Sequence, residues 1–575
     1  MRAGAIGART YNRGPDHAPV AMSFLQDPPQ LPDPWLADRV LRGWLDWRLS
    51  SARRAALEPH LLALAAHARD AWAERQRTPR REPVLTQWDA WGARVDRIAL
   101  TPVWERGPAI TTRHGLLWAG HADSADGAAR ADQFARMYLY HCASEFYTCP
   151  LAMTDGAIAA LEASGERALI ERVLPRYLSR DPATLWLSGQ WMTETPGGSD
   201  VAHSETIARR DAAGQWHLYG RKWFSSAVVG EAALALARPE GAGDGGSALG
   251  LFHVETRDAA GNWNGLRVQR LKDKLGTREL PTAEIELDGV PAWPLGEPAH
   301  GVRKIAPMLN VTRLWSTLGA LATARRALAL AGDYATCRQA FERRLTAQPL
   351  HRETLADAAC AFEAAFHLAF HAALLLGRVE AGVATADEAA ALRLLIPLAK
   401  LWVSKLAVAL VSECLEASGG AAYIEDTGLP QLLRDVQVFP IWEGTTNVIA
   451  LDMLRALGQN GLTPLRDALT PALAATDPSA VQTVHDAFDA AERWLATNAG
   501  ARERLEAGAR GLGFTLARTC AAALLAGHAA WSSRRGEAAP AAALTRFLAR
   551  GLDRLAGPCA DSDAVLAGLF SRDAG

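Results

Sequence analysis

Residues 191–201 read WMTETPGGSDV, and the composition of the chain changes at this stretch. Upstream, from about residue 35 to 187, Ala, Leu and Arg recur at helical spacing, as in GAIAALEASGERALIERVLPRYL. From 188 to 296, short apolar or alternating runs such as WHLYGRKWF and TAEIELDGV are separated by DAAG, EGAGDGGSALG and DAAGNWNG. This pattern predicts a small antiparallel β domain, after which helices return from about residue 303.

The order helix, β, helix predicts a mainly α chain with a central antiparallel β domain. Arg2, Arg9 and Arg13 lie in a first segment that lacks the continuous apolar core of a secretory signal. We expect that segment to be disordered, with Met22 as an alternative start. The predicted organisation is a tail over 1–21, a helical domain over 22–187, a β-barrel domain over 188–296, a helical bundle over 297–455 and a further helical subdomain over 456–575.

Bulk composition limits the classes of partner. The chain has 575 residues, 49% of them hydrophobic, and 61 Lys plus Arg against 63 Asp plus Glu, so its whole surface offers no field for nucleic acid or an anionic membrane. Seven scattered cysteines without a CxxC pair favour a reduced, cytoplasmic setting. The longest apolar run, AAFHLAFHAALLL at 364–376, is shorter than the roughly 20 residues of a membrane span, so we expect no membrane insertion.

The stretch 191–201 also carries chemical groups. Thr193 and Ser199 supply hydroxyls, while Gly197 and Gly198 leave the backbone sterically open. Such groups can donate hydrogen bonds to a flat heterocycle and a pyrophosphate. Taken alone, an ordinary polar turn explains the same residues equally well.

Further short motifs follow in order: KWFSSA at 222–227, RQAF at 338–341, LEASGGAAY at 415–423, and LLRDVQV with FPIWEGTTNV between 432 and 448. In this order and spacing they resemble the acyl-CoA dehydrogenase flavoproteins. The resemblance implies a helical domain, a β-barrel and a four-helix bundle, followed here by a C-terminal helical extension. It also implies FAD as cofactor and an acyl-CoA as substrate.

By this resemblance Trp223 packs against the isoalloxazine, Ser225 bonds near the reactive flavin nitrogen, and Arg338 reaches the pyrophosphate across a subunit interface. A guanidinium can donate two parallel hydrogen bonds to phosphate, which a lysine cannot. The chain departs from the family at Ser226, where Asn is usual, and at Glu342, where Gly is usual; Arg343 or Arg344 could compensate for the added acid. The implied cofactor residues are Met192, Thr193, Gly198, Ser199, Trp223, Ser225, Arg338, Phe341, Glu416, Gly419, Gly420, Thr445 and Asn447.

Glu443 is the implied catalytic base, which removes the α-proton of an acyl-CoA thioester while the β-hydrogen leaves as hydride to flavin N5. A carboxylate in water is too weak a base for this step, but burial beside apolar walls disfavours the charged form of an acid. In some branches the base projects from the position of Thr312, which cannot serve. The alternative for Glu443 is a carboxylate that interacts favourably with a helix start. The implied substrate residues are Ser199, Asn310, Arg313, Trp442 and Gly444.

Trp442 replaces a family tyrosine beside the acyl site, and its larger ring predicts short or branched acyl chains. The resemblance implies an electron-transfer flavoprotein as acceptor, although no residue pattern separates a dehydrogenase from an oxidase. Because Arg338 is expected to act across an interface, a homo-oligomer, either a dimer or a tetramer, is expected.

Within the family, SGQWMTETPGGSDV, RLKDKLGTRELPTAEIELDG and MLNVTRLW most resemble the AidB-like branch of alkylation-response flavoproteins. The resemblance to that branch implies an alternative function, that of a DNA-associated flavoprotein with weak dehydrogenase activity. Residues 451–575 contain 13 Arg, no Lys and 13 Asp or Glu, so the extension is neutral, which argues against DNA as the main partner. An arginine stripe around Arg502, Arg504 and Arg510 is interleaved with acids.

Two other patterns in the sequence suggest different functions. Glu363, His367 and His371 share one face of a helix at four-residue spacing, which is metal-ligand geometry, but there is no HExxH and no ligand from elsewhere in the chain can be named. The sequence therefore predicts no metal. GGSDV lacks the G-x-S-x-G elbow, so a hydrolase is disfavoured.

Overall fold

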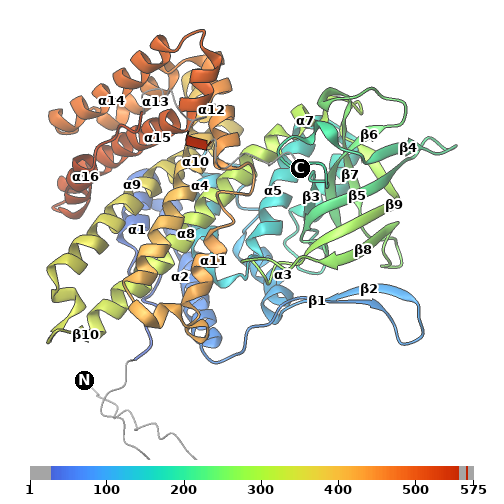
Figure 1. Ribbon diagram of the computed structural model, residues 1–575, viewed down its shortest axis with the longest axis horizontal. Coiled ribbons are helices and arrows are strands. Elements are labelled where there is room, and N and C mark those ends of the chain that lie inside the picture. The colour runs from blue at the N-terminus through green and yellow to red at the C-terminus, as the bar shows by residue number, and fades with distance from the viewer. Residues whose placement is uncertain (1–26, 556–564, 567–575) are drawn as a thin grey trace, which may run out of the picture.

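The computed structural model describes residues 27–555 and 565–566, so the tail expected over 1–21 lies outside the described residues. Figure 1 shows helices on one side of the molecule and a β domain on the other, with the chain crossing between them more than once. The N-terminal elements are α1 (Arg39–Arg48), α2 (Ser51–Arg75), β1 (Val84–Trp88), β2 (Arg94–Ala99), α3 (Pro102–His114), α4 (Ala129–Tyr140), α5 (Thr148–Ser164) and α6 (Arg167–Tyr177).

A β-hairpin interrupts the N-terminal helical domain, where the sequence predicted helices alone. Strands β1 and β2 pair antiparallel, with Val84 opposite Ala99. The hairpin extends along the underside of the β domain in Figure 1, and Gln87 donates to the carbonyl oxygens of Val268 and Gln269 there. The helical domain is therefore attached to the β domain through side-chain hydrogen bonds to a strand edge.

The β domain contains β3 (Ser188–Trp191), β4 (Ile207–Arg210), β5 (Trp216–Ser226), β6 (Ala232–Pro239), β7 (Gly250–Glu255), β8 (Leu266–Leu271) and β9 (Thr282–Pro294). Strands β6, β4, β5, β9 and β7 pair in a closed ring, with β3 beside β6 and β8 beside β9. The predicted barrel and its mainly antiparallel pairing are thus confirmed, but two of the strand pairs are parallel. Strands β3 and β4 both pair with β6 in parallel, because β6 re-enters the sheet after a crossover rather than a hairpin.

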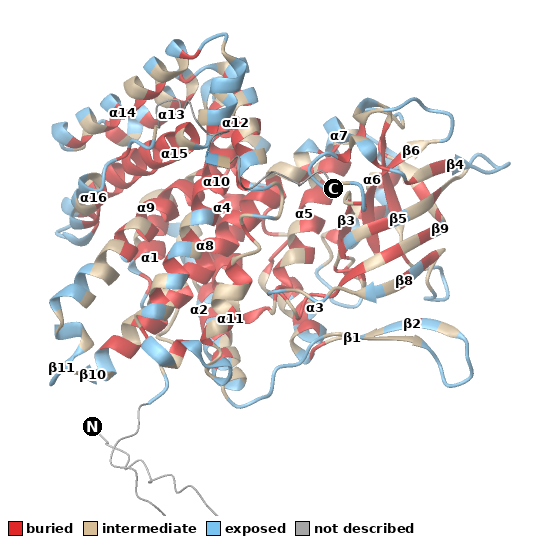
Figure 2. Ribbon diagram, in the orientation of Figure 1, coloured by how far each residue is buried: buried red, intermediate tan, exposed pale blue. Residues whose placement is uncertain are grey.

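The helical bundle contains α7 (Gly301–Lys304), α8 (Ala306–Cys337), α9 (Pro349–Glu380), α10 (Ala386–Glu416), α11 (Leu429–Val436) and α12 (Thr446–Asn460), with the short hairpin β10 (Gln339–Ala340) and β11 (Arg343–Arg344) joining α8 to α9. Helix α10 begins with a capping box in which Thr385 and Glu388 satisfy each other's backbone N–H groups. Figure 2 shows α8, α9 and α10 buried along most of their length.

Helices α9 and α10 are long and apolar enough to cross a bilayer by length and composition alone. However, 83% and 78% of their apolar windows are buried inside the protein. These two helices therefore form the core of the bundle, where an all-round apolar surface is covered by neighbouring helices.

The C-terminal extension contains α13 (Thr463–Leu473), α14 (Pro478–Thr497), α15 (Arg502–Ser533) and α16 (Ala539–Ala549). Helix α15 packs on α9, α10 and α12, and residues such as Leu516 and Leu525 belong to the same hydrophobic core as the bundle. Helix α12 also runs across the expected boundary at 455. The extension therefore continues the bundle core instead of forming a core of its own.

Candidate active site

Glu443 lies in the loop between α11 and α12, and its backbone has a φ of +59°, a left-handed conformation that is uncommon outside glycine. Two cations hold this backbone in place. Arg313 Nε on α8 donates to the Glu443 carbonyl at 3.3 Å, and Lys400 Nζ on α10 donates to the Gly444 carbonyl at 2.7 Å. The strained turn is thus fixed by two helices of the bundle, as is typical where strain serves a site.

The Glu443 carboxylate is half-buried and faces two other elements. Thr312 Oγ1 on α8 lies 2.7 Å from Glu443 Oε2, and Gln190 Nε2 on β3 lies 3.4 Å from the same oxygen. Among the described residues no hydrogen bond joins this carboxylate to the first turn of α12. Glu443 therefore points to the junction of β3 and α8, which the helix-start alternative does not explain.

Thr312 has a hydroxyl with one hydrogen and three neighbouring acceptors, the Glu443 carboxylate and the carbonyls of Met308 and Leu309. Its Oγ1 also lies 3.1 Å from the Met308 carbonyl one turn earlier. Donation to Glu443 and donation to Met308 therefore exclude each other. When it donates to the carboxylate, Thr312 fixes the direction in which Glu443 Oε2 points.

Lys400 was not among the residues predicted from the sequence. Its side chain is buried, and burial, partly offset by the Glu443 carboxylate and reinforced by Arg313, lowers the pKa of Lys400 to about 7 from 10.5. Arg313 is itself held by Asp452, with Nη1 2.6 Å from Oδ2. The loop that carries Glu443 thus rests on one fixed cation and one cation that titrates near neutral pH.

The stretch 191–201 is joined directly to β5. The Trp223 backbone N–H donates to the Thr193 carbonyl at 2.9 Å, and Glu194 accepts from Lys222 inside the barrel at 2.5 Å. A Cβ at Gly198 would lie 2.9 Å from Thr193 Cγ2, so only glycine fits there without a shift. The two motifs that were expected to contact the flavin therefore form one surface.

That surface contains polar atoms without partners among the described residues. Ser225 Oγ on β5 and Gln190 Oε1 on β3 are both buried and make no hydrogen bond there, although buried polar groups are normally paired. The Trp223 ring is half-buried and has Lys272 Nζ 3.3 Å from its centre. A buried hydroxyl, a buried amide oxygen on a residue next to Glu443 and an aromatic ring can hydrogen-bond to and stack on a flavin, so the residues present fit FAD.

The predicted pyrophosphate and adenosine residues lie at the far end of α8. Arg338 caps α8 roughly 26 residues after Thr312, about 39 Å along the axis at 1.5 Å per residue. Phe341 is 92% exposed at the tip of the hairpin, and Glu416, Gly419 and Gly420 are exposed at the end of α10. A flavin dinucleotide is shorter than this separation, so Arg338 cannot reach the flavin beside its own Glu443.

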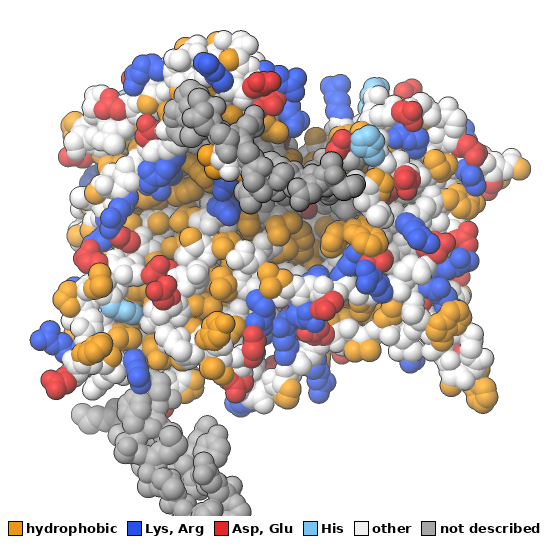
Figure 3. Space-filling view, viewed as in Figure 1, with side chains coloured by type: hydrophobic (Ala, Val, Ile, Leu, Met, Phe, Trp, Pro, Cys, Tyr) orange, Lys and Arg blue, Asp and Glu red, His pale blue; other side chains and the backbone are white. Residues whose placement is uncertain are grey.

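The remaining predicted residues lie on α8, at the end of β3, in the loop that follows β3 and at the start of α12. Asn310 is half-buried on α8, two residues before Thr312, and Met192 is half-buried at the end of β3. Ser199 is exposed near the turn at Glu194–Gly197, and Thr445 and Asn447 are exposed at the start of α12. On the face in Figure 3, hydrophobic side chains gather between the helical bundle and the β domain.

An aromatic cluster (His141, Phe146, Phe439 and Trp442) stands behind Glu443. Phe146 meets Trp442 edge-on at 6.1 Å and stacks on Phe439 at 5.9 Å. Beyond it, a cavity of about 700 Å³ is lined by His141 and Phe146 and, among others, by Trp72, Thr323, Arg326, Gln431 and Asp435. This cavity opens to the surface, because its lining also includes exposed residues such as Arg77, Arg80 and Asp426.

Four family models match successive parts of the chain. They are the adaptive response protein AidB N-terminal domain over residues 27–181, the acyl-CoA dehydrogenase middle domain over 189–290, the acyl-CoA dehydrogenase C-terminal domain over 299–458 and the acyl-CoA dehydrogenase 11 C-terminal domain-like model over 469–557. Together they span nearly all of the described residues.

Relatives with curated descriptions agree with these models. The chain is 41% identical over 473 residues to acyl-CoA dehydrogenase family member 11 of Caenorhabditis elegans, covering 79% of this chain and 77% of that protein. It is 35% identical over 388 residues to the AidB protein of Escherichia coli, covering 66% of this chain and 69% of that one. The crystal structure of C. elegans ACDH-11 in complex with C11-CoA superposes with a TM-score of 0.92 at 36% identity, over 97% of this chain and 98% of that chain.

Proposed function

Because the chain belongs to the acyl-CoA dehydrogenase family, in its AidB-like branch, we propose that Glu443 is the base of an FAD-dependent α,β-dehydrogenation of an acyl-CoA. The observation that carries the proposal is the Glu443 carboxylate, half-buried at the junction of α8 and β3, with Thr312 and Gln190 on one of its oxygens. FAD, when bound, accepts the β-hydrogen as a hydride.

Glu443 takes the α-proton as the Cα–H bond breaks, and the electron pair of that bond forms the double bond with the β-carbon. The proton remains on the Glu443 carboxylate. Negative charge that develops on the thioester oxygen is stabilised by the backbone N–H of Glu443. The base and this donor thus come from one residue, whose backbone conformation sets the distance between them.

Neighbouring side chains position the base. Thr312 and Gln190 orient the carboxylate oxygen, while Arg313 and Lys400 hold the carbonyl oxygens of Glu443 and Gly444. Holding a reacting group within a few tenths of an ångström of its productive position is a large part of catalysis. We therefore assign these four residues to positioning.

The joined surface of β3, the 191–201 stretch and β5 would hold the flavin ring, chiefly through Thr193, Trp223 and Ser225. Arg338 of a second copy of the chain would hold the pyrophosphate, since Arg338 lies too far from its own Glu443. The protein is accordingly a cytoplasmic homodimer or homotetramer that passes electrons to an electron-transfer flavoprotein.

Acyl-chain length is set by the aromatic cluster. With Trp442 in contact with Phe146, the space behind Glu443 suits short or branched chains. The C. elegans relative was solved with C11-CoA, and a chain of that length in this protein requires the cluster to open, for which the neighbouring cavity lined by His141 and Phe146 offers space.

The DNA-associated alternative is disfavoured by how the cations of the extension are used. Arg466 pairs with Asp489 and Glu492, and Arg502 pairs with Glu506. Further ion pairs join Arg546 to Glu353 and Asp357, and Arg550 to Asp357. Because residues 451–575 also contain as many acids as arginines, 13 of each, the extension offers phosphates no net positive charge.

The test is Glu443→Gln, which keeps the size of the side chain and removes the base. We expect the variant to purify with yellow FAD yet to show no flavin bleaching when an acyl-CoA is added anaerobically. Glu537→Gln, at an exposed position between α15 and α16, is the matched control and should bleach at the wild-type rate. Normal bleaching of Glu443→Gln would remove Glu443 from the reaction.

A further inference from the structure

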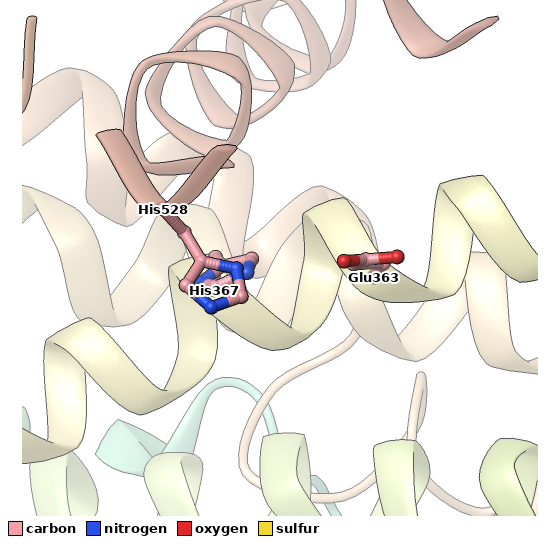
Figure 4. A group of neighbouring side chains, drawn as sticks. All are labelled: Glu363, His367 and His528. Carbon is pink, nitrogen blue, oxygen red and sulfur yellow. The ribbon is translucent and has the colours of Figure 1, made fainter. Parts of the chain in front are cut away.

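Three buried side chains from two distant parts of the chain meet between the bundle and the C-terminal extension. Glu363 and His367 lie one turn apart on α9, and His528 comes from α15. Their ligand atoms lie within 4.8 Å of one another, and their residues are 0%, 0% and 1% exposed. Figure 4 shows His528 reaching from α15 to His367, with Glu363 further along α9.

The imidazole nitrogens at this meeting point lack partners among the described residues. Neither Nδ1 nor Nε2 of His367 makes a hydrogen bond there, and the same holds for Nδ1 of His528. A buried ring nitrogen without a partner is costly, since most buried polar atoms in native proteins are satisfied. Three unsatisfied nitrogens in one cluster indicate a ligand.

His528 and Glu363 are each held by a hydrogen-bond partner outside the cluster. His528 Nε2 lies 3.4 Å from the Ser532 hydroxyl, which leaves Nδ1 directed at the cluster. Arg39 Nη1 donates to Glu363 Oε1 at 2.9 Å and Nη2 to Oε2 at 2.5 Å. Hydrogen bonds of this kind behind the ligands are the usual support of protein metal sites.

We propose that Glu363, His367 and His528 bind a divalent d-block cation of the Zn²⁺ type, with water as the fourth ligand. Two imidazoles and one carboxylate form a donor set typical of zinc. Arg39 does not exclude the ion, because each carboxylate oxygen has a second lone pair and the Arg39 side chain is half exposed, so that water screens its charge.

The bound ion joins α15 to α9. It acts as a cross-link between the C-terminal extension and the bundle, in addition to their shared apolar contacts. The sequence could assemble only the α9 half of this site, because its third ligand lies more than 150 residues downstream.

The experiment uses tag-free full-length holoprotein produced with added Zn²⁺ and then dialysed. Elemental analysis should find about one Zn per chain. After the metal is stripped by a chelator, titration with Co²⁺ should produce the visible absorption of a four-coordinate N/O site, and Zn²⁺ should raise the melting temperature. FAD content, read from its own absorbance, reports that the protein remains folded.

His528→Phe keeps a ring of similar size without nitrogen and should abolish the Co²⁺ absorption and the Zn²⁺-dependent melting shift. Ser532→Ala should weaken Zn²⁺ binding about tenfold or more, as the loss of a supporting hydrogen bond does. His485→Ala, at an exposed position on α14, should bind as the wild type does. If the stripped wild-type protein binds Co²⁺ and Zn²⁺ no more tightly than His528→Phe does, the site does not exist. The same conclusion follows if Ser532→Ala fails to fold and the wild-type protein shows no bound metal.

Discussion

Lys400→Met is expected to make the protein more stable and less active at the same time. The ammonium group is buried and donates to the Gly444 carbonyl at 2.7 Å. Methionine fills a similar volume without charge or donor. The substitution therefore removes a buried charge from the core and a support from the loop that carries Glu443.

The size of the stability change follows from the lowered pKa. A fall from 10.5 to about 7 means that the folded state disfavours the charged amine by about 5 kcal/mol relative to the unfolded chain. Because the folded pKa is depressed, this penalty is complete below pH 7 and shrinks as the pH rises toward 10.5, to about 2 kcal/mol at pH 9. Loss of the charged donor costs about 1.5–3 kcal/mol in the opposite direction. The variant should gain about 2–3 kcal/mol at pH 6 and about 1 kcal/mol at pH 9, where the amine is neutral and its hydrogen bond contributes only about 0.5–1.5 kcal/mol.

The activity change comes from the loop. Without its donor, the Gly444 carbonyl no longer anchors the left-handed backbone at Glu443. If the lost 1.5–3 kcal/mol falls on the transition state, flavin reduction slows by about 10- to 100-fold. Melting temperatures of the holoprotein at pH 6 and pH 9, together with anaerobic stopped-flow bleaching by an acyl-CoA, measure the two effects separately.

Lys405→Met is the matched control, because Lys405 lies on the same helix and is exposed. It should leave both the melting temperature and the bleaching rate near their wild-type values. A Lys400→Met variant whose melting temperature changes equally at the two pH values would refute the buried-charge argument. Bleaching at the wild-type rate would show that Lys400 does not position the base.

Three further outcomes test other parts of the site. Thr312→Val removes the hydroxyl 2.7 Å from the Glu443 carboxylate and should slow bleaching about tenfold. Thr317→Val is the control, because the Thr317 hydroxyl donates to the Arg313 carbonyl on the same helix, and it should not slow bleaching. Equal bleaching rates in the two variants would remove Thr312 from the site. Trp442→Ala should shift the preference from isovaleryl-CoA toward a C11 acyl-CoA. A wild-type protein whose bleaching rate already rises with acyl-chain length up to C11 would contradict the limit set by this ring. Co-expression of Glu443→Gln with Arg338→Ala should restore about a quarter of wild-type activity, averaged over all the randomly mixed oligomers. Only a site that combines the intact Glu443 of one chain with the intact Arg338 of the other is active. No restoration would place Arg338 in the site of its own chain.

The sequence singled out Glu443 as the candidate base because the family motif there is a short run of adjacent residues. WEGTT keeps the acid, the glycine and the hydroxyls in a fixed order, and the other motifs precede it at the expected spacing. The order of helical and β segments was equally readable, since helix and strand periodicities differ over a few residues. Local pattern was sufficient for both.

Local pattern was not sufficient for the partners of Glu443. Gln190 and Lys400 reach it from elements that lie 253 and 43 positions away in the chain, and only the packing of β3 and α10 brings them together. Lys400 did leave a signal, as a single lysine within the apolar run LLIPLAKLWV. A lysine in such a run is rarely buried without a specific partner.

The β1–β2 hairpin was missed for a different reason. Residues 84–99, VLTQWDAWGARVDRIA, alternate as strands do and enclose a turn at DAWG, but they stand within an Ala- and Arg-rich helical region. The parallel pairing of β3 and β4 with β6 could not be predicted, because strand order depends on tertiary contacts that no single segment encodes.

The C-terminal extension is better understood as part of the dehydrogenase than as an added module. Helix α15 packs on α10, the helix that carries Lys400, and on α12, which begins directly after the Glu443 loop. Its apolar residues belong to the same core as α8 and α9, and Arg466 and Arg546 form ion pairs with acids of the extension and of α9. A surface built to hold DNA would keep its cations free and its core separate. The packing therefore links the extension to the geometry of the base, whatever else it contacts.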